Sequence, residues 1–279
     1  MTTTRRVWEF SVHCGFAVFA TGLLMCGTEA RADDVQNADV RQPAAMLREA
    51  KTEAPISAFA YTAYGTHAGT YGVQGYAVGL TGSGSSAMGG GGFLAWGAPM
   101  DGLTLVVDAP RDVYVGGHFA PSVAGIVRLV GSAGTGFSLG GLGKYKVEGF
   151  GTDPNGDIES EIEGGLLLSY SGSGLHVDLN SITGFGLTEE GEIDTEARFR
   201  LGYDVASFMR IGLDGQGRYR LAGTKKLLNG ASYDFAGGPQ VIVGTRQFFG
   251  ALTAGPATLG IADSGVVGGT AIVTLCGML

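Results

Sequence analysis

Cysteine is almost absent from this chain of 279 residues, which contains only Cys14, Cys26 and Cys276. Cys14 and Cys26 fall within an N-terminal export signal, so a mature protein would keep Cys276 alone. One cysteine cannot close an internal disulfide, and no cluster of Cys and His has the spacing of a zinc site. An exported protein of this kind has to be held together by its core or by a closed network of hydrogen bonds.

A long apolar run is missing too. The 13 residues that begin at Cys14 and end at Cys26 are apolar, but a membrane-spanning helix requires ~20. Arg5 and Arg6 precede this run, and Ala30-Arg31-Ala32 follows it as an A-x-A cleavage site. These features predict a secretory signal peptide that is cleaved from the chain. A lipoprotein signal and a twin-arginine signal are the alternatives.

Positive charge is scarce. The chain has 18 Lys and Arg residues against 26 Asp and Glu residues, a net charge of −8 at pH 7. Removal of residues 1–32 takes away three basic and two acidic residues, which leaves 15 against 24 and a net charge of −9. Nucleic-acid binding requires basic patches, so this composition argues against it.

Glycine, by contrast, is abundant, at 51 of 279 residues, whereas average usage is roughly 7%. It shows no G-X-Y period, which excludes collagen. Hydrophobic residues make up 44% of the chain, which is too many for a disordered protein. Glycine in strands permits close packing, bulges and sharp coiling, as small barrels with crowded interiors require.

The clearest pattern is a two-residue alternation of charged and apolar side chains. Glu159, Glu161 and Glu163 alternate with Ile158 and Ile162, and successive side chains of a β-strand point to opposite faces. The alternation recurs between turn-forming segments in stretches of ~10–15 residues, close to the ~9–11 that cross a bilayer when tilted. The sequence therefore predicts an all-β, antiparallel transmembrane β-barrel of about twelve strands, within a range of about ten to fourteen.

The chain divides into three parts. Residues 1–32 are the predicted signal peptide, residues 33–55 a short amphipathic helix or a mobile linker, and residues 56–279 the barrel domain. Within the barrel domain, we expect residues 56–64 to be a strand and the polar residues 80–88 to be a loop.

In these features the chain resembles bacterial outer-membrane β-barrel proteins. The resemblance covers about residues 56–279 and rests on the export signal, the alternating segments and aromatic residues near strand ends, such as Tyr145, Tyr170 and Tyr219. It identifies no subfamily and leaves the oligomeric state open. It implies an outer-membrane location and, as partners, outer-membrane lipid and the barrel-assembly machinery.

The main candidates for a functional site are charged residues at the alternate strand positions that would face the barrel lumen. Since neighbouring strands bring residues on the same face close together, we predict a lumenal mesh of Arg–carboxylate pairs. Such a mesh either fills and rigidifies a narrow barrel or lines a charge-selective pore. Its predicted members are Glu159, Glu161, Glu163, Arg198, Arg200, Asp204, Arg210, Asp214, Arg218 and Arg220.

No catalytic, cofactor-binding or metal-binding residues are predicted. His67, His118 and His176 are scattered, and no lipase or deacylase motif surrounds them. The glycine run at residues 89–92 precedes no predicted helix and is not a phosphate loop. We therefore expect no enzyme activity and no cofactor.

The leading hypothesis is an outer-membrane barrel with a structural role or a passive role as a conduit for small solutes. The first alternative is a secreted or surface-exposed soluble β protein of adhesin-like type, which would place Arg198 and Arg218 on its outer face. The second is a membrane-embedded lipid-modifying enzyme, which would gather a His with a Ser or Asp within hydrogen-bond reach at one rim.

Overall fold

The structure is a computed structural model. Among the residues that it describes, there is no helix with the length and apolar character needed to cross a membrane. The predicted signal peptide and the helical or linker segment, residues 1–32 and 33–55, lie outside these residues. The described residues are 60–64, 69–82, 85–100, 102–109, 120–131, 134–148, 159–187, 192–221, 232–245, 248–259 and 266–278.

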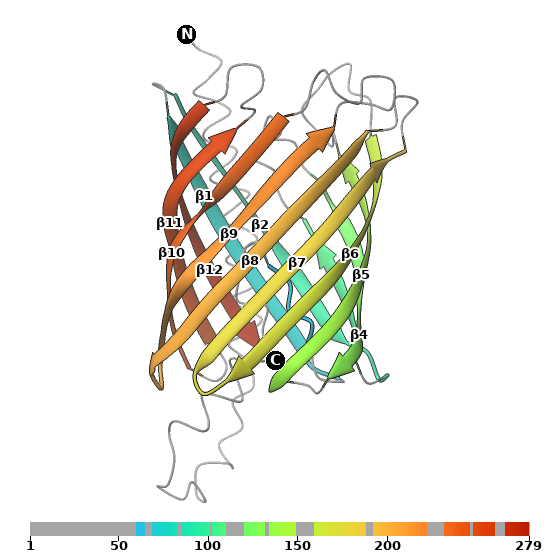
Figure 1. Cartoon of the computed structure of the whole chain (residues 1–279), viewed down its shortest axis with the longest axis vertical. Helices are drawn as coiled ribbons and strands as arrows, with labels where there is room; N and C mark the ends of the chain where they lie inside the picture. Colours follow the sequence, from blue (N-terminus) through green and yellow to red (C-terminus); the bar gives the residue numbers. More distant parts are fainter. Residues whose placement is uncertain are drawn as a thin grey trace, which may run out of the picture.

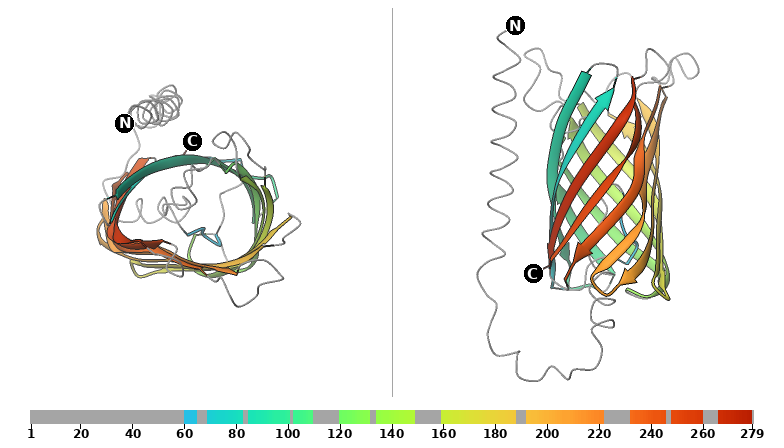
Figure 2. Two further views of the ribbon diagram at one scale, coloured as in Figure 1. Left: turned by 90° about the horizontal axis from the view of Figure 1, so that it is seen from above. Right: turned by 90° about the vertical axis from the view of Figure 1, so that its left-hand side faces the viewer.

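Within these ranges the chain forms twelve strands, and each pairs antiparallel with its neighbours in sequence. The first strand also pairs with the last, so the sheet closes into a barrel (Figures 1 and 2). This confirms the predicted all-β, antiparallel barrel of about twelve strands. The strands are β1 (Tyr71–Gly82), β2 (Ser85–Gly97), β3 (Leu103–Asp108), β4 (Ser122–Gly131), β5 (Gly136–Glu148), β6 (Glu159–Gly172), β7 (Leu175–Gly186), β8 (Ile193–Ala206), β9 (Met209–Leu221), β10 (Ser232–Gly244), β11 (Phe248–Leu259) and β12 (Val266–Met278).

The two ends of the barrel differ in the length of their connections. At one end, Ser173 and Gly174 alone join β6 to β7, and their φ angles of 51° and 81° suit a two-residue hairpin turn of type I′. At the other end, residues 149–158 separate β5 from β6, and residues 222–231 separate β9 from β10. Membrane barrels commonly show this asymmetry. The two ends are called here the short-turn end and the long-loop end.

Strand β7 shows how the sequence sets the two faces of the wall. Leu175 and Leu179 are 37% and 48% exposed and point outward, whereas His176, Asp178 and Asn180 are buried on the inner face. Each outward apolar side chain is followed by an inward polar one, because the side-chain direction reverses at every residue.

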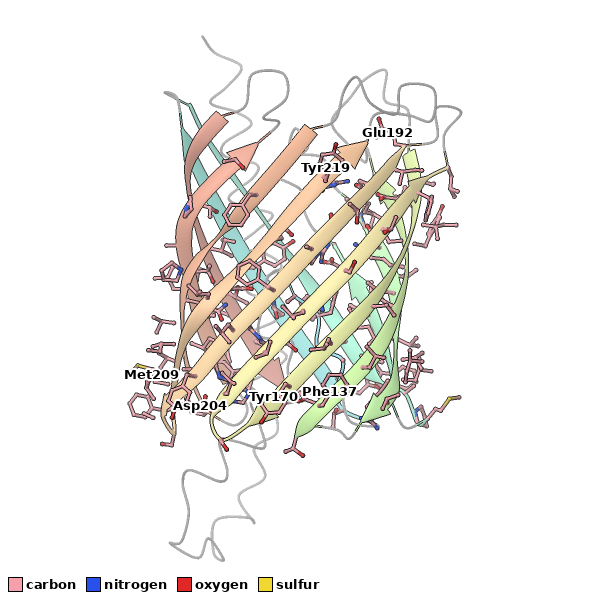
Figure 3. The ribbon with its side chains drawn as sticks, in the orientation of Figure 1. Phe137, Tyr170, Glu192, Asp204, Met209 and Tyr219 are labelled. Carbon is pink, nitrogen blue, oxygen red and sulfur yellow. The ribbon has the colours of Figure 1, made fainter. Side chains whose placement is uncertain are left out.

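Apolar side chains cover the outer face of the barrel. Leu166 and Leu213 are 60% and 44% exposed at positions midway along β6 and β9. Phe137 and Tyr170 lie at the short-turn end and Tyr219 at the long-loop end, and all three are exposed (Figure 3). An apolar band with aromatic residues at both borders is typical of a barrel in lipid.

Residues 60–64 do not form the predicted strand. Ala60–Tyr64 are 0–8% exposed and lie inside the ring of strands, where the short blue segment is seen in Figure 2. The physical reason is that β1 and β12 already pair with each other, so the closed sheet has no free edge for a further strand. Ala60–Tyr64 are called the internal segment below.

The predicted loop at residues 80–88 is also wrong. β1 continues to Gly82 and β2 begins at Ser85, with Leu80 opposite Ala87 in the ladder. A ladder is built from main-chain groups, which Ser and Gly supply as well as other residues do. A polar, glycine-rich composition was therefore not sufficient to identify a loop.

Apolar side chains fill parts of the interior. A first cluster surrounds two residues of the internal segment, and a second lies on β10–β12. The first consists of Tyr61, Ala63, Ala95, Val106, Ala124, Ile126, Leu142, Leu167 and Ile182, and the second of Ile242, Phe249, Ala251 and Cys276.

Glycine is required where two strands approach too closely for a side chain. Gly212 on β9 pairs with Gly202 on β8. A Cβ atom on Gly212 would collide with the carbonyl oxygen of Leu201 and lie 2.8 Å from the Cα of Gly202. Gly164 on β6 is the opposite case, because no atom lies within 4 Å of its Cβ position.

Gly212→Ala and Gly164→Ala should therefore change stability in opposite directions. The first should lower the free energy of unfolding by about 1–3 kcal/mol, because main-chain atoms have to move. The second should raise it by about 0.4–1 kcal/mol, because it restricts the unfolded chain. Urea titrations of both variants in lipid vesicles measure these values, and equal effects would contradict the close approach at Gly212.

Candidate functional site

The predicted charged residues lie on the inner face of the barrel. Glu161, Glu163, Arg200, Arg210, Asp214 and Arg218 are buried there, and Arg198 and Asp204 lie on the same face with side chains 12% and 15% exposed. Glu159 and Arg220 occupy positions in β6 and β9, but their side chains lie outside the described part of the structure.

Glu161 and Glu163 of β6 form ion pairs with lysines of β5, partners that were not predicted. Lys144 lies opposite Glu163 and Lys146 opposite Glu161 in the ladder between β5 and β6. The Nζ atoms of Lys144 and Lys146 lie 3.1 Å and 3.2 Å from Glu163 carboxylate oxygens, and Lys146 also pairs with Glu161. The reason is the order of strands: β6 pairs with β5 and β7, whereas the arginines are on β8 and β9.

Between β8 and β9 the structure does bring arginines and carboxylates together. Arg218 Nε donates to Asp194 Oδ2 at 2.6 Å and lies 3.6 Å from Glu196 Oε1. Arg198 Nε donates to Glu196 Oε2 at 2.8 Å. These four side chains form one continuous group, because Glu196 contacts both arginines.

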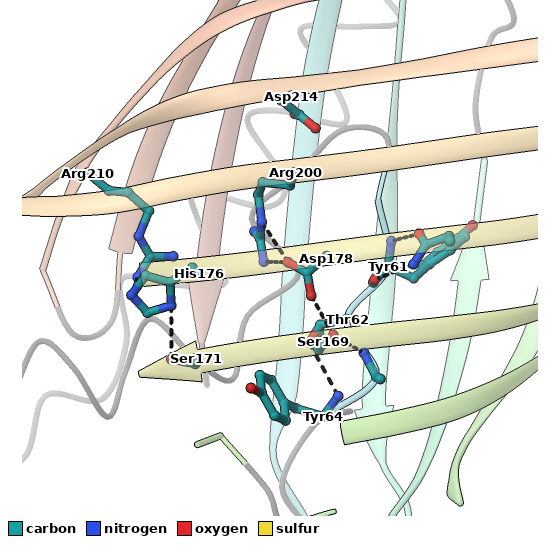
Figure 4. A network of polar contacts seen from close by, with 12 residues as sticks. Tyr61, Thr62, Tyr64, Ser169, Ser171, His176, Asp178, Arg200, Arg210 and Asp214 are labelled. Atoms are coloured by element: carbon teal, nitrogen blue, oxygen red, sulfur yellow. Dashed lines mark hydrogen bonds and ion pairs between the residues drawn. The ribbon is translucent and has the colours of Figure 1, made fainter. Parts of the chain in front are cut away.

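A second ionic group lies nearer the short-turn end (Figure 4). Arg200 Nε donates to Asp178 Oδ2 at 2.8 Å, and Ser169 Oγ donates to the other oxygen of the same carboxylate. Asp214 is fully buried and accepts a hydrogen bond from Gln240 Nε2 at 2.8 Å. Asp178 and Asp214 thus each accept from a donor on a neighbouring strand, as burial of charge demands.

The charged side chains occupy one side of the lumen. The described charged groups on the inner face lie on β3–β9, and cations and anions are nearly equal in number. Among the described side chains of β10–β12, β1 and β2, those facing the lumen are uncharged, and the buried polar ones are Gln74, Gln240, Thr253, Thr270 and Thr274. The charged ones are Arg128, Lys144, Lys146, Arg198, Arg200, Arg210, Arg218, Asp108, Glu161, Glu163, Asp178, Asp194, Glu196, Asp204 and Asp214.

The internal segment is bound to this charged side (Figure 4). Asn180 Oδ1 accepts from the N–H of Tyr61 at 2.7 Å, and Asn180 Nδ2 donates to the carbonyl of Tyr61 at 2.9 Å. Ser169 Oγ accepts from the N–H of Ala63 at 2.8 Å. The segment is therefore attached to β6 and β7 through its main chain.

Further contacts attach the segment to β4, β5 and β8. Arg128 Nη1 donates to the carbonyl of Tyr64 at 3.2 Å, and the Tyr64 hydroxyl donates to the carbonyl of Gly136. The Cζ of Arg198 lies 5.3 Å from the centre of the Tyr61 ring, within the range of a cation–π interaction.

Ser171, His176 and Arg210 (Figure 4) form a separate polar cluster near the short-turn end, together with Asp204. His176 Nδ1 lies 3.0 Å from Ser171 Oγ, and His176 Nε2 lies 2.8 Å from Asp204 Oδ2 and 2.6 Å from an Arg210 Nη atom. Arg210 Nε also donates to Asp204 Oδ1 at 2.8 Å. His67 and His118 lie outside the described residues.

Several members of the wall escaped the sequence prediction: Lys144, Lys146, Asp178, Asp194 and Glu196. Asp194 and Glu196 share the parity of the predicted residues on β8, and Lys144, Lys146 and Asp178 alternate with outward apolar residues on β5 and β7. The alternation alone was therefore a sufficient signal for their inward direction. Their partners depend on the register between strands, which the alternation does not supply. Within the described chain, no group of three or more His, Cys, Asp or Glu side chains is arranged to hold a metal ion.

The distribution of side chains is the inverse of that in a soluble protein. Leu166, Leu201 and Leu213 are exposed on the outside, whereas Arg198 and Arg218 face the lumen, opposite to what a soluble adhesin-like protein requires. A closed sheet with an apolar outer face pairs its main-chain groups within the protein, as lipid demands. These features define a transmembrane β-barrel.

Comparison with known proteins adds a likeness of fold. No family model matches the chain, and no curated protein matches it either. It is similar in fold to outer-membrane expressed OmpT of Vibrio cholerae, with a TM-score of 0.43 and 9% identity over 75% of this chain and 97% of that one. It is also similar to a bacterial polysaccharide outer membrane secretin, with a TM-score of 0.40 and 7% identity over 77% and 99% of the two chains. A third similar fold is the translocator domain of the autotransporter NalP from Neisseria meningitidis. Its TM-score is 0.40 and its identity 13%, over 76% of this chain and 89% of that one.

Arg200→Met should lower the free energy of unfolding by about 3–5 kcal/mol, because Asp178 would remain as an unpaired buried charge. The double change Arg200→Met with Asp178→Leu should recover most of this loss, because an apolar pair of similar volume replaces the ions. Urea titrations of the single and double variants in lipid vesicles compare the two. A double variant no more stable than the single one would show that the stability does not depend on this charge pair.

Proposed function

We propose that this barrel lies in a bacterial outer membrane and has a passive role there, as a structural element of the membrane and a narrow conduit for small solutes. The internal segment occludes the conduit at rest. The observation that carries the proposal is the position of Ala60–Tyr64, which are 0–8% exposed inside the ring of strands. The hydrogen bonds of this segment to Ser169 and Asn180 support a defined resting position.

The charges of the wall support a passive role. Cationic and anionic side chains are interspersed on β3–β9, as in the Arg218–Asp194 and Lys144–Glu163 pairs. A lining of mixed sign attracts neither cations nor anions strongly, whereas selective pores carry rings of one sign. The paired charges also hold neighbouring strands in register, which suits a rigid wall.

The energies of the internal segment support its displacement. Its four main-chain hydrogen bonds to Asn180, Ser169 and Arg128 contribute about 2–6 kcal/mol together. Burial of its two tyrosine side chains contributes about 3–6 kcal/mol. Ordering of five residues costs about 5–10 kcal/mol. The Tyr64 hydroxyl bond and the Arg198–Tyr61 contact add to the favourable contributions and tip this near balance toward the bound position. Loss of one contact is therefore expected to shift the occupancy of the lumen by the segment.

Tyr61→Ala should raise the single-channel conductance severalfold in planar bilayers. The substitution removes the ring that packs against Arg198 and the apolar cluster, and so weakens the internal segment. Tyr203→Ala is the matched control, because Tyr203 is 54% exposed on the outer face. Both variants should keep heat-modifiable gel migration, which reports a folded barrel. The proposal fails if the wild type already conducts as well as Tyr61→Ala.

A second candidate function is hydrolysis, because Ser171, His176 and Asp204 lie within hydrogen-bond reach at one rim. The guanidinium of Arg210, which only donates hydrogen bonds, lies 2.6 Å from His176 Nε2. If Nε2 carries the proton, it donates to Asp204 and Nδ1 accepts from Ser171; if Nε2 accepts from Arg210, Nδ1 donates to Ser171 instead. Ser171 and His176 are only 7% and 5% exposed, which leaves a substrate little access to either side chain. We therefore propose that the cluster stabilises the rim and is not catalytic.

A fluorophosphonate probe labels activated serines. We expect it to label neither the wild-type protein nor Ser171→Ala. The probe and the two proteins are compared by gel fluorescence after incubation of folded barrels in detergent. Labelling of the wild type that disappears in both Ser171→Ala and His176→Ala would establish a hydrolase instead.

A further inference from the structure

The wall binds the internal segment chiefly through the main chain of the segment. The side-chain amide of Asn180 both accepts from the N–H of Tyr61 at 2.7 Å and donates to its carbonyl at 2.9 Å. A neighbouring strand makes the same two bonds to a residue in an antiparallel ladder. Ser169 Oγ accepts from the N–H of Ala63 at 2.8 Å. Contacts of this kind recognise a peptide main chain independently of the side chains that it carries.

Two positions of the segment do restrict the side chain. Ala63 is fully buried, and a Cβ atom on Gly140 would lie 3.4 Å from both its Cα and its Cβ. Only a small residue fits between this part of β5 and the rest of the wall. The Tyr61 ring lies 5.3 Å from the Cζ of Arg198, an arrangement that favours an aromatic residue. With Thr62 between them, the recognised order is aromatic, polar, small.

The fourth position extends this order and places the site near the short-turn end. The Tyr64 hydroxyl donates to the carbonyl of Gly136, the first residue of β5, and Arg128 Nη1 donates to the carbonyl of Tyr64. Gly69, which follows the segment, donates its N–H to the carbonyl of Gly97 at 2.8 Å. Gly97 is the last residue of β2, at the same end of the barrel. A peptide that arrives from the short-turn end meets the Tyr64 position first.

We propose that the lumenal wall formed by β4–β8 is a binding site for a peptide from another protein, with the order aromatic, polar, small, aromatic. The internal segment is the resident occupant, and a flexible segment of a partner at the short-turn end displaces it. This inference rests on the proposed function in one respect: displacement of the internal segment is expected to open the proposed conduit. Binding of the peptide does not itself require that solutes pass.

The site is tested with the pentapeptide AYTAY, the sequence of the internal segment, with an amidated C-terminus and a fluorophore on its N-terminus. Fluorescence anisotropy measures its binding to the folded protein that begins at residue 33, in detergent. Tyr61→Ala weakens the resident segment and should bind the peptide at least about tenfold more tightly than the wild type. In a Cys276→Ser background, Thr62→Cys with Ser169→Cys should form a disulfide, because their hydroxyl oxygens lie 3.3 Å apart. This variant should bind the peptide only after reduction.

Two controls examine recognition itself. The peptide AYTLY, with leucine in place of the residue equivalent to Ala63, should bind at least about tenfold more weakly, because Gly140 leaves no room for it. Asn180→Leu combined with Tyr61→Ala should also lose at least about tenfold in affinity, and Asn180→Asp should lose less, because it keeps the acceptor. Heat-modifiable migration identifies variants that remain folded, and the peptide control requires no change in the wall.

The outcomes separate this site from the conduit. If Tyr61→Ala binds no peptide, or binds AYTAY and AYTLY equally well, the peptide site is overturned. If Tyr61→Ala raises conductance but binds no peptide, the conduit stands without the peptide site. If AYTAY binds selectively while Tyr61→Ala leaves conductance unchanged, the peptide site stands and the conduit is overturned.

Discussion

The pairing of β1 with β12 is the interaction on which the rest of this structure depends. Eleven residue pairs, from Gly72 opposite Met278 to Gly82 opposite Gly268, close the sheet. Closure pairs the main-chain groups of the edge strands within the protein, which is the condition for residence in lipid. It also divides all side chains into an outer set and an inner set, and it leaves no edge for Ala60–Tyr64. The internal segment therefore lies inside the barrel as a consequence of closure.

The interior that results is asymmetric. Charged side chains line β3–β9, whereas the described inward side chains of β10–β12, β1 and β2 are neutral or apolar. The internal segment lies on the charged side, because its main-chain groups need polar partners once they leave water. Those partners are Asn180, Ser169 and Arg128. Tyr61 and Ala63 pack in the same apolar cluster as Leu167 and Ile182.

Ion pairs in this wall follow the order and register of strands more than the identity of the charges. Glu163 contacts Lys144 because β5 is its neighbour, and Arg218 contacts Asp194 and Glu196 because β8 is its neighbour. The cost of removing each charge from water is offset only by a partner at short range. This explains why the pairing is local and why the cationic and anionic groups remain interspersed around the lumen.

The residue pattern was enough to predict the class of fold and the direction of most side chains. The alternation around Glu161 and in β7 was sufficient for this, because side-chain direction in a strand has a period of two. Three features could be seen only in the folded barrel: the partner of each charge, the interior position of Ala60–Tyr64 and the contact between Ser171, His176 and Asp204. All three depend on register and on closure of the sheet, which arise from contacts between residues far apart in the chain and leave no local signal.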